Sequence, residues 1–175
     1  MHKNPALYAL CGLAFFRSNV IGMNTAIIGS GSWGTALAVL LSKKGCSVKL
    51  WARRDELAQV MAREHVNAQY LPGVFLPDAV MPTSDIADAL IDSDTVILAV
   101  PSGGVRQALV LLKDYLKPGM LIVHAGKGLE CETGLRGSQV ISEVLGDEVG
   151  RECVVLSGPN LAVELAKDIP TATVV

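Results

Sequence analysis

Charged residues are scarce in this chain, and the sequence has no internal repeat and no low-complexity tract. Only 18% of the 175 residues are charged, whereas 50% are hydrophobic. This composition excludes a disordered chain, and the length suffices for one domain with a substantial core. The formal net charge of −2 provides no basic surface, so we expect no nucleic acid and no membrane among the partners.

Cysteine and histidine are also rare, and neither residue forms a cluster. No CxxC pair and no Cys/His combination has the spacing of a zinc site, so the sequence predicts no metal. Separate cysteines are typical of free thiols in a reducing cytoplasm, which is the expected location. No histidine is assigned a catalytic role. The residues concerned are Cys11, Cys46, Cys131, Cys153, His2, His65 and His124.

The apolar stretch over residues 6–16 is too short to cross a bilayer. With Lys3 before it, the stretch resembles a signal peptide, but no small-residue cleavage site follows. Met23 stands directly before the first predicted strand. We therefore expect residues 1–22 to be an extension from an upstream start, with a targeting segment as the alternative, and one domain over residues 23–175.

Short apolar strands alternate with helical patterns from Met23 onward. This order predicts a mostly parallel sheet with helices on both faces, a Rossmann-like doubly wound α/β domain. A long loop over residues 67–77 is unusual in a compact domain and is a candidate for function. Strands are predicted over residues 25–28, 47–51, 94–100, 120–124 and 153–156 and from Thr171 to Val175. Helices are predicted over residues 33–44, 55–63 with Asp55 as the cap, 84–90, 105–116, 137–145 and 161–166.

The stretch Gly29-Ser30-Gly31-Ser32-Trp33-Gly34 joins the first predicted strand to the first predicted helix. Three glycines at this spacing, between a strand and a helix, are typical of a dinucleotide-binding turn. Gly29 allows the sharp turn, Gly31 lets a pyrophosphate approach the backbone, and Gly34 lets the helix pack closely on the strand. The N-terminus of the helix then offers N–H groups to the phosphates.

Arg53 and Arg54 follow the second predicted strand, where an NAD-specific site usually has an acidic residue. Guanidinium groups suit the 2′-phosphate of NADP(H), because they offer paired donors to phosphate oxygens. Both arginines also stand at a helix start, where cations are unfavourable without a nearby anion. Two surface arginines with Asp55 as their partner are the alternative. The sequence thus predicts a preference for NADP(H), with NAD(H) as the second cofactor.

Three further loops follow predicted strands, at the edge where open sheets bind ligands. Ser102 is expected either to cap the next helix or to contact the cofactor. Lys127 stands between two glycines and is a candidate for binding a phosphate or polarising a carbonyl, with an exposed turn lysine as the alternative. The stretch Ser157-Gly158-Pro159-Asn160 is either a second anion-binding turn or an ordinary connection that Asn160 caps.

Several stretches form one ordered pattern between residues 23 and 175: residues 29–38, Leu50-Trp51-Ala52-Arg53-Arg54, Asn67 with Tyr70-Leu71-Pro72-Gly73, Ala99-Val100-Pro101-Ser102, Lys127-Gly128-Leu129-Glu130, Ser157-Gly158-Pro159 and Pro170-Thr171-Ala172. This pattern resembles the start of bacterial NAD(P)-dependent glycerol-3-phosphate dehydrogenases. The combination is far more specific than the glycine turn alone.

The resemblance implies reversible reduction of dihydroxyacetone phosphate to sn-glycerol 3-phosphate by NADPH or NADH, for glycerophospholipid synthesis, in a homodimeric enzyme. It also implies that Lys127 faces both the cofactor and the substrate phosphate. By position, the residues that match the family's cofactor contacts are Ser32, Trp33, Arg53, Arg54, Lys127 and Ala162. The glycine turn adds Gly29, Gly31 and Gly34 to the expected cofactor site. The residues that match substrate contacts are Lys127, Gly158 and Asn160.

The sequence departs from the family at two points. Asn160 stands where the family usually has Ser or Thr, followed by Leu161 where it has Phe, although an amide still offers a donor and an acceptor. The resemblance also implies a helical domain whose catalytic lysine lies beyond Val175. No catalytic residue is therefore assigned, and we expect cofactor binding without turnover. Another two-domain dehydrogenase, such as a hydroxyacid dehydrogenase or a ketopantoate reductase, and a non-catalytic dinucleotide-binding module are the alternatives.

Overall fold

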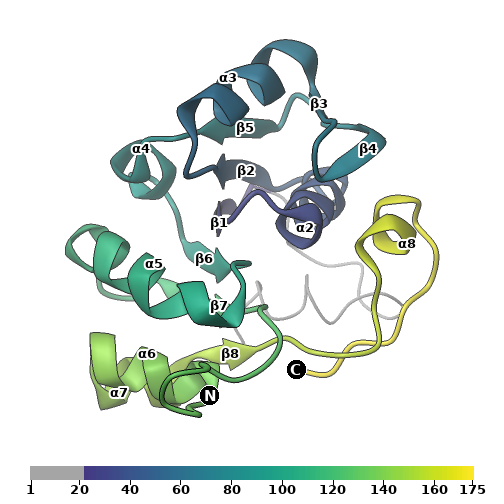
Figure 1. Ribbon diagram of the computed structural model, residues 1–175. Helices are drawn as coiled ribbons and strands as arrows, with labels where there is room; N and C mark the ends of the chain where they lie inside the picture. Colours follow the sequence, from purple (N-terminus) through teal and green to yellow (C-terminus); the bar gives the residue numbers. More distant parts are fainter. Residues whose placement is uncertain (1–21) are drawn as a thin grey trace.

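The computed structural model describes residues 22–175 and shows a layered α/β fold (Figure 1). Expectations for residues 1–21, including Cys11 and His2, lie outside the described residues. The central sheet has six strands in the order β5-β2-β1-β6-β7-β8, and each neighbouring pair is parallel. These strands are β1 (Asn24–Ile28), β2 (Ser47–Trp51), β5 (Val80–Thr83), β6 (Thr95–Leu98), β7 (Leu121–His124) and β8 (Val154–Val155).

Helices cover both faces of the sheet, which confirms the predicted Rossmann-like fold class (Figure 1). They are α2 (Ser32–Lys43), α3 (Asp55–Glu64), α4 (Ile86–Leu90), α5 (Val105–Leu112), α6 (Gly137–Leu145), α7 (Asp147–Glu152) and α8 (Ala162–Ala166), with 3₁₀ turns η1 (Ser102–Gly104) and η2 (Lys113–Tyr115). One apolar core contains side chains of α2, α3 and α8, and a second contains those of α4, α5 and α6. Side chains of β1 alternate between them, because Ile27 belongs to the first core and Ala26 and Ile28 to the second.

The sheet grows in two directions from β1. The chain first adds β2 and β5 on one side, and it then crosses back to place β6 on the other side of β1. Ile28 pairs with Leu98, so the glycine turn after β1 adjoins the backbone that follows β6. Open parallel sheets bind ligands at such a reversal point, outside the carboxyl ends of the strands.

Several elements differ from the sequence predictions. The expected loop 67–77 contains most of an antiparallel hairpin, formed by β3 (Val66–Asn67) and β4 (Leu71–Phe75). The edge strand β5 and the helix α7 were not predicted. Strand β5 contains Pro82 and is recognisable only once it lies beside β2, since a short strand is defined by its hydrogen-bonded partner.

Two local predictions are wrong. Asp55 is the first residue of α3 and not its cap, because its carboxylate accepts hydrogen bonds from Ser84 and Gln59. The strand predicted from Thr171 to Val175 is reduced to one antiparallel bridge between Ser157 and Val174. Val175 itself belongs to no strand and is 45% exposed. The end of the described chain thus folds back on the loop after β8 and adds no parallel strand to the sheet.

Candidate functional site

The glycine turn between β1 and α2 is shaped by close backbone contacts at two of its glycines. Gly29 has a φ of +115°, and a methyl group there would lie 2.8 Å from the Ala99 carbonyl oxygen. A methyl group at Gly34 would lie 1.9 Å from the Gly29 carbonyl oxygen. Gly31 differs, because no atom lies within 4 Å of the position that its methyl group would take. The turn is therefore tight on the protein side and open on the outer side, as a pyrophosphate cradle requires.

Helix α2 begins directly at this turn. Its N-cap residue, Gly31, makes no side-chain cap, and its first turn contains no acidic residue. The first N–H groups of a helix have no partner within the helix, and they carry the positive end of its dipole. The arrangement can therefore bind an anion in front of Gly31, which is the chemistry that a dinucleotide needs.

A cleft of about 470 Å³ extends from the glycine turn over the ends of β2 and β6. Arg53 and Arg54 line it together with Trp51 and Tyr70. Arg54 donates a hydrogen bond to the amide oxygen of Gln69. Within residues 22–175, Arg53 makes no hydrogen bond and no ion pair with a side chain, and Asp55 pairs with neither arginine. Both guanidinium groups therefore keep their charge available to a ligand in the cleft.

The β3–β4 hairpin is fastened to the glycine turn by Asn67, whose side chain is fully buried. The Asn67 amide nitrogen donates to the Ser30 carbonyl oxygen and to Thr35 Oγ1, both at 2.8 Å. The Ser32 hydroxyl donates to the Tyr70 carbonyl oxygen. The sequence analysis gives Asn67 no role of its own in the site, although Asn67 begins the loop 67–77 and belongs to the ordered pattern that resembles the family.

A second cleft, of about 400 Å³, contains Lys127. The Lys127 ammonium donates to Asn160 Oδ1 at 2.8 Å and to the backbone oxygens of Gly158 and Asn160 at 3.0 and 3.2 Å. Its nitrogen also lies 5.6 Å from the centre of the Trp33 ring, a cation–π distance. All three acceptors are neutral, so no carboxylate compensates the positive charge. Lys127 is exposed, as in the alternative interpretation, but these hydrogen bonds hold its ammonium in place.

The two clefts are continuous, because Gly31, Ala99, Val100 and Pro101 line both. The structure therefore gathers the predicted residues along one crevice at the carboxyl edge of the sheet. The glycine turn lies in the middle, and the arginines lie in the first cleft. The second cleft is lined by Ser32, Trp33, Lys127, Asn160 and Ala162. Gly158 reaches this group through its carbonyl oxygen, which accepts from Lys127.

Lys127 is the one lysine that lines either cleft among the described residues. Its ammonium is already bound by three oxygens, and the sequence prediction gives it a binding role. Val175, beyond which the catalytic lysine is expected, lines neither cleft. The structure of residues 22–175 therefore offers no second lysine in the crevice for the catalytic role, and that prediction stays a prediction.

Of the two interpretations given for Ser102 and for Asn160, helix capping is wrong in both cases. Ser102 lies inside the 3₁₀ turn η1, and α5 begins after Gly104 without a side-chain cap. Asn160 does not cap α8, whose N-cap residue is Leu161. The Asn160 side chain is buried and accepts a hydrogen bond from Lys127 instead. A polar residue before a helix is a cap only if its side chain turns toward the helix, which the sequence does not specify.

His124 is buried at the end of β7, and burial lowers its pKa. Its Nδ1 atom has no hydrogen-bond partner among the described residues, and His124 lines neither cleft.

In the described part of the chain, no group of three or more His, Cys, Asp or Glu side chains could hold a metal ion. No helix among residues 22–175 is long and apolar enough to cross a membrane.

Comparison with known proteins assigns the family. The family described as NAD-dependent glycerol-3-phosphate dehydrogenase N-terminus matches residues 24–175. A glycerol-3-phosphate dehydrogenase [NAD(P)+] of Corynebacterium kroppenstedtii is 49% identical over 150 residues, which are 86% of this chain and 45% of the relative. One of Moorella thermoacetica is 48% identical over 150 residues, which are 86% of this chain and 44% of the relative.

A solved structure gives the same result. The glycerol-3-phosphate dehydrogenase of Coxiella burnetii superimposes with a TM-score of 0.75 at 33% identity, over 87% of this chain and 46% of that protein. The chain thus spans about half the length of the relatives that it matches. The family match covers nearly all of the described residues, and the glycine turn, the arginines and Lys127 all lie within it. This chain therefore belongs to the NAD-dependent glycerol-3-phosphate dehydrogenase N-terminal family.

Proposed function

We propose that this chain binds a nicotinamide dinucleotide in the two joined clefts and forms the cofactor-binding part of a glycerol-3-phosphate dehydrogenase. The observation that carries the proposal is the open space in front of Gly31, at an uncapped helix N-terminus between two joined clefts. The names of the relatives support the choice of ligand. When bound, the cofactor supplies or accepts the hydride that interconverts dihydroxyacetone phosphate and sn-glycerol 3-phosphate.

The residues divide the cofactor between the two clefts. Backbone N–H groups at Gly31, Ser32 and Trp33 would hold the pyrophosphate. Arg53 and Arg54 would hold a 2′-phosphate in the first cleft, which favours NADP(H) over NAD(H). The arginines support this preference because no carboxylate of the described chain neutralises either of them.

The second cleft suits the other end of the cofactor and the substrate phosphate. Lys127 has only neutral oxygen partners there, so an anion that enters the cleft meets an uncompensated charge. Gly158 and Asn160 hold the ammonium in place, and the Asn160 amide nitrogen, which donates to Thr173 Oγ1 at 3.5 Å, has a second N–H for a phosphate oxygen. Ala162 lines the same cleft without a polar group, which leaves room beside the cofactor.

Further parts of the proposal concern the whole enzyme. We propose that it acts in the cytoplasm in glycerophospholipid synthesis, that it forms a homodimer, and that its partners are small molecules, not nucleic acid or membrane. Residues 23–175 are proposed to be the dinucleotide-binding domain. Proton transfer to the substrate oxygen is assigned to no residue of this chain, because the family's catalytic lysine is proposed to lie beyond Val175.

Calorimetric titration of the 175-residue chain with NADPH and with NADH tests the cofactor assignment. We expect tighter binding of NADPH, because a charge-assisted hydrogen bond contributes roughly 1.5–3 kcal/mol. Replacing Arg53 and Arg54 together by alanine should weaken NADPH by about tenfold or more and leave NADH nearly unchanged. The matched control is Arg63→Ala, an exposed arginine at the other end of α3. Equal affinities of the parent for both cofactors would refute the preference.

A further inference from the structure

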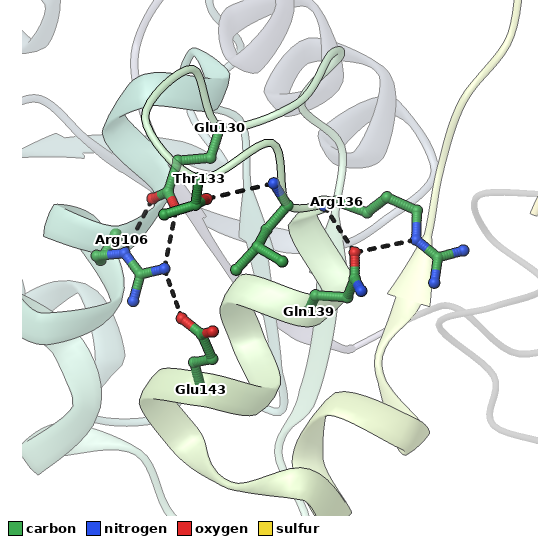
Figure 2. Close-up of polar contacts among 7 residues, drawn as sticks. Arg106, Glu130, Thr133, Arg136, Gln139 and Glu143 are labelled. Carbon is green, nitrogen blue, oxygen red and sulfur yellow. Dashed lines mark hydrogen bonds and ion pairs between the residues drawn. The ribbon is translucent and has the colours of Figure 1, made fainter.

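Arg106 and Glu130 form a two-pronged ion pair (Figure 2), and neither residue lines either cleft. Arg106 lies on α5, and Glu130 lies in the loop 125–136 between β7 and α6. The guanidinium Nε donates to Oε1 at 2.9 Å and Nη2 donates to Oε2 at 2.8 Å. The Thr133 hydroxyl adds a hydrogen bond to Oε2 at 2.6 Å. Together, Arg106 first and then Thr133, they lower the pKa of Glu130 to about 2.

The same guanidinium contacts a second carboxylate. Arg106 Nη2 donates to Glu143 Oε2 on α6 at 2.7 Å (Figure 2). The two carboxylates differ in exposure, because the Glu130 side chain is 8% exposed and that of Glu143 is 52% exposed. One arginine thus joins a helix to a buried carboxylate in a loop and to a half-exposed carboxylate on another helix.

Glu130 is the only buried residue between positions 126 and 136. Leu129 beside it is 53% exposed, whereas Leu135, at the far end of the loop, is partly buried against the second core. Within the loop, the Glu130 N–H donates to the Leu135 carbonyl and the Gly134 N–H donates to the Glu130 carbonyl. The loop is therefore a compact turn that Leu135 holds at its far end, and the carboxylate paired with Arg106 attaches the part that follows Lys127.

Lys127 stands three residues before this anchor, on the same loop. Its ammonium must reach Asn160 and Gly158 on a segment more than thirty residues later in the chain. Removing either member of this pair leaves the other without its charged partner, which is unfavourable at a site sheltered from water, and breaks the two-pronged contact that fixes the loop. If the Glu130 anchor were released, the loop would shift outward, and Lys127 would lose its place between Asn160 and the Trp33 ring.

We propose that Arg106 and Glu130 are positioning residues that hold Lys127 in the second cleft. The consequence for the ligand rests on the proposed function, since it is the cofactor and the substrate phosphate that need this lysine. Glu143 is assigned no such role, because among the described residues its side chain forms an ion pair with Arg106 from α6 and no hydrogen bond to the loop. The two carboxylates therefore form a matched pair for an experiment.

The test compares Glu130→Gln with Glu143→Gln in the 175-residue chain. The first readout needs no ligand: the rate at which an amine-acetylating reagent modifies Lys127, measured by mass spectrometry. The reference is Lys113, which is also exposed but whose side chain makes no hydrogen bond among the described residues. We expect Glu130→Gln to raise the relative rate at Lys127 by about fivefold or more, because an ordered loop opens once its anchor is lost. Glu143→Gln should leave this rate within about twofold of the parent.

The second readout is the dissociation constant of NADPH. Glu130→Gln should weaken binding by about tenfold, Arg106→Lys should weaken it less because it keeps the charge and loses the fork, and Glu143→Gln should leave it nearly unchanged. If Glu130→Gln does not fold, Arg106→Lys takes its place in both measurements. Equal effects of Glu130→Gln and Glu143→Gln on Lys127 would overturn the inference. Failure of the parent to bind any dinucleotide would refute the proposed function instead, and the acetylation rates would still decide whether the ion pair positions Lys127.

Discussion

Alanine at Gly31 and alanine at Gly34 are expected to have opposite consequences, although both positions belong to the same turn. Gly31 has a φ of −69° and open space around it, so alanine fits without strain. A Gly→Ala change of this kind restricts the unfolded chain and stabilises a protein by about 0.4–1 kcal/mol. The new methyl group, however, occupies the approach of the pyrophosphate. We expect Gly31→Ala to fold normally and to bind NADPH at least about tenfold more weakly.

Gly34→Ala brings a methyl carbon to 1.9 Å from the Gly29 carbonyl oxygen, and neither atom belongs to a flexible side chain. Overpacking in a dense interior costs typically about 1–3 kcal/mol, and we take the upper end because the contact involves backbone. The higher helix propensity of alanine returns about 1 kcal/mol. A net loss of about 2 kcal/mol corresponds to a melting temperature roughly 4–8 °C lower for a domain of this size.

Differential scanning calorimetry and NADPH titration of the two variants separate these outcomes. The expected pattern is a stable variant that binds poorly for Gly31→Ala and a less stable variant for Gly34→Ala. Parent-like affinity in Gly31→Ala would show that the phosphates do not pass this glycine. A melting temperature of Gly34→Ala equal to that of the parent would show that the turn relaxes, and the close-packing argument would then be wrong.

Three further predictions concern catalysis, the N-terminal residues and acid. The 175-residue chain should bind NADPH but should not oxidise it with dihydroxyacetone phosphate. Turnover near that of an intact dehydrogenase would contradict this prediction and would require a catalytic group before Val175. Lys127→Ala should weaken NADPH binding without a large drop in melting temperature. A chain that begins at Met23 should fold and bind as well as the longer one, and a large loss of thermal stability would show that residues 1–22 stabilise the domain. The folded-state pKa of Glu130 lies below the ordinary value of 4.5, at about 2, so its contribution to stability is present above pH 4.5 and is lost as the pH falls toward 2. Acid unfolding of Glu130→Gln should therefore depend less on pH in this window than that of the parent, and identical pH profiles would count against the ion pair.

The sequence by itself determined the features that depend on neighbouring residues. The turn after β1 is predictable because its glycines lie within six residues and Gly34 packs against Gly29 itself, although the contact of Gly29 with Ala99 is tertiary. The alternation of apolar strands with helices predicts a parallel sheet, since each strand must be followed by a crossover. The edge at which Arg53 and Lys127 lie follows from the same rule, because both come directly after predicted strands.

Only the tertiary structure decided how these loops fit together. Asn67 reaches back 37 residues to the Ser30 carbonyl, and Lys127 reaches forward 33 residues to Asn160. Arg106 meets Glu130 across 24 residues, with η2 and β7 between them in the chain. No periodicity or local preference encodes such pairs, because a polar side chain at a loop can cap a helix, enter water or bind a distant partner. Which of these occurs depends on the burial and the unpaired groups that appear when the strands align, and this is why Asn160 holds a lysine and does not cap a helix.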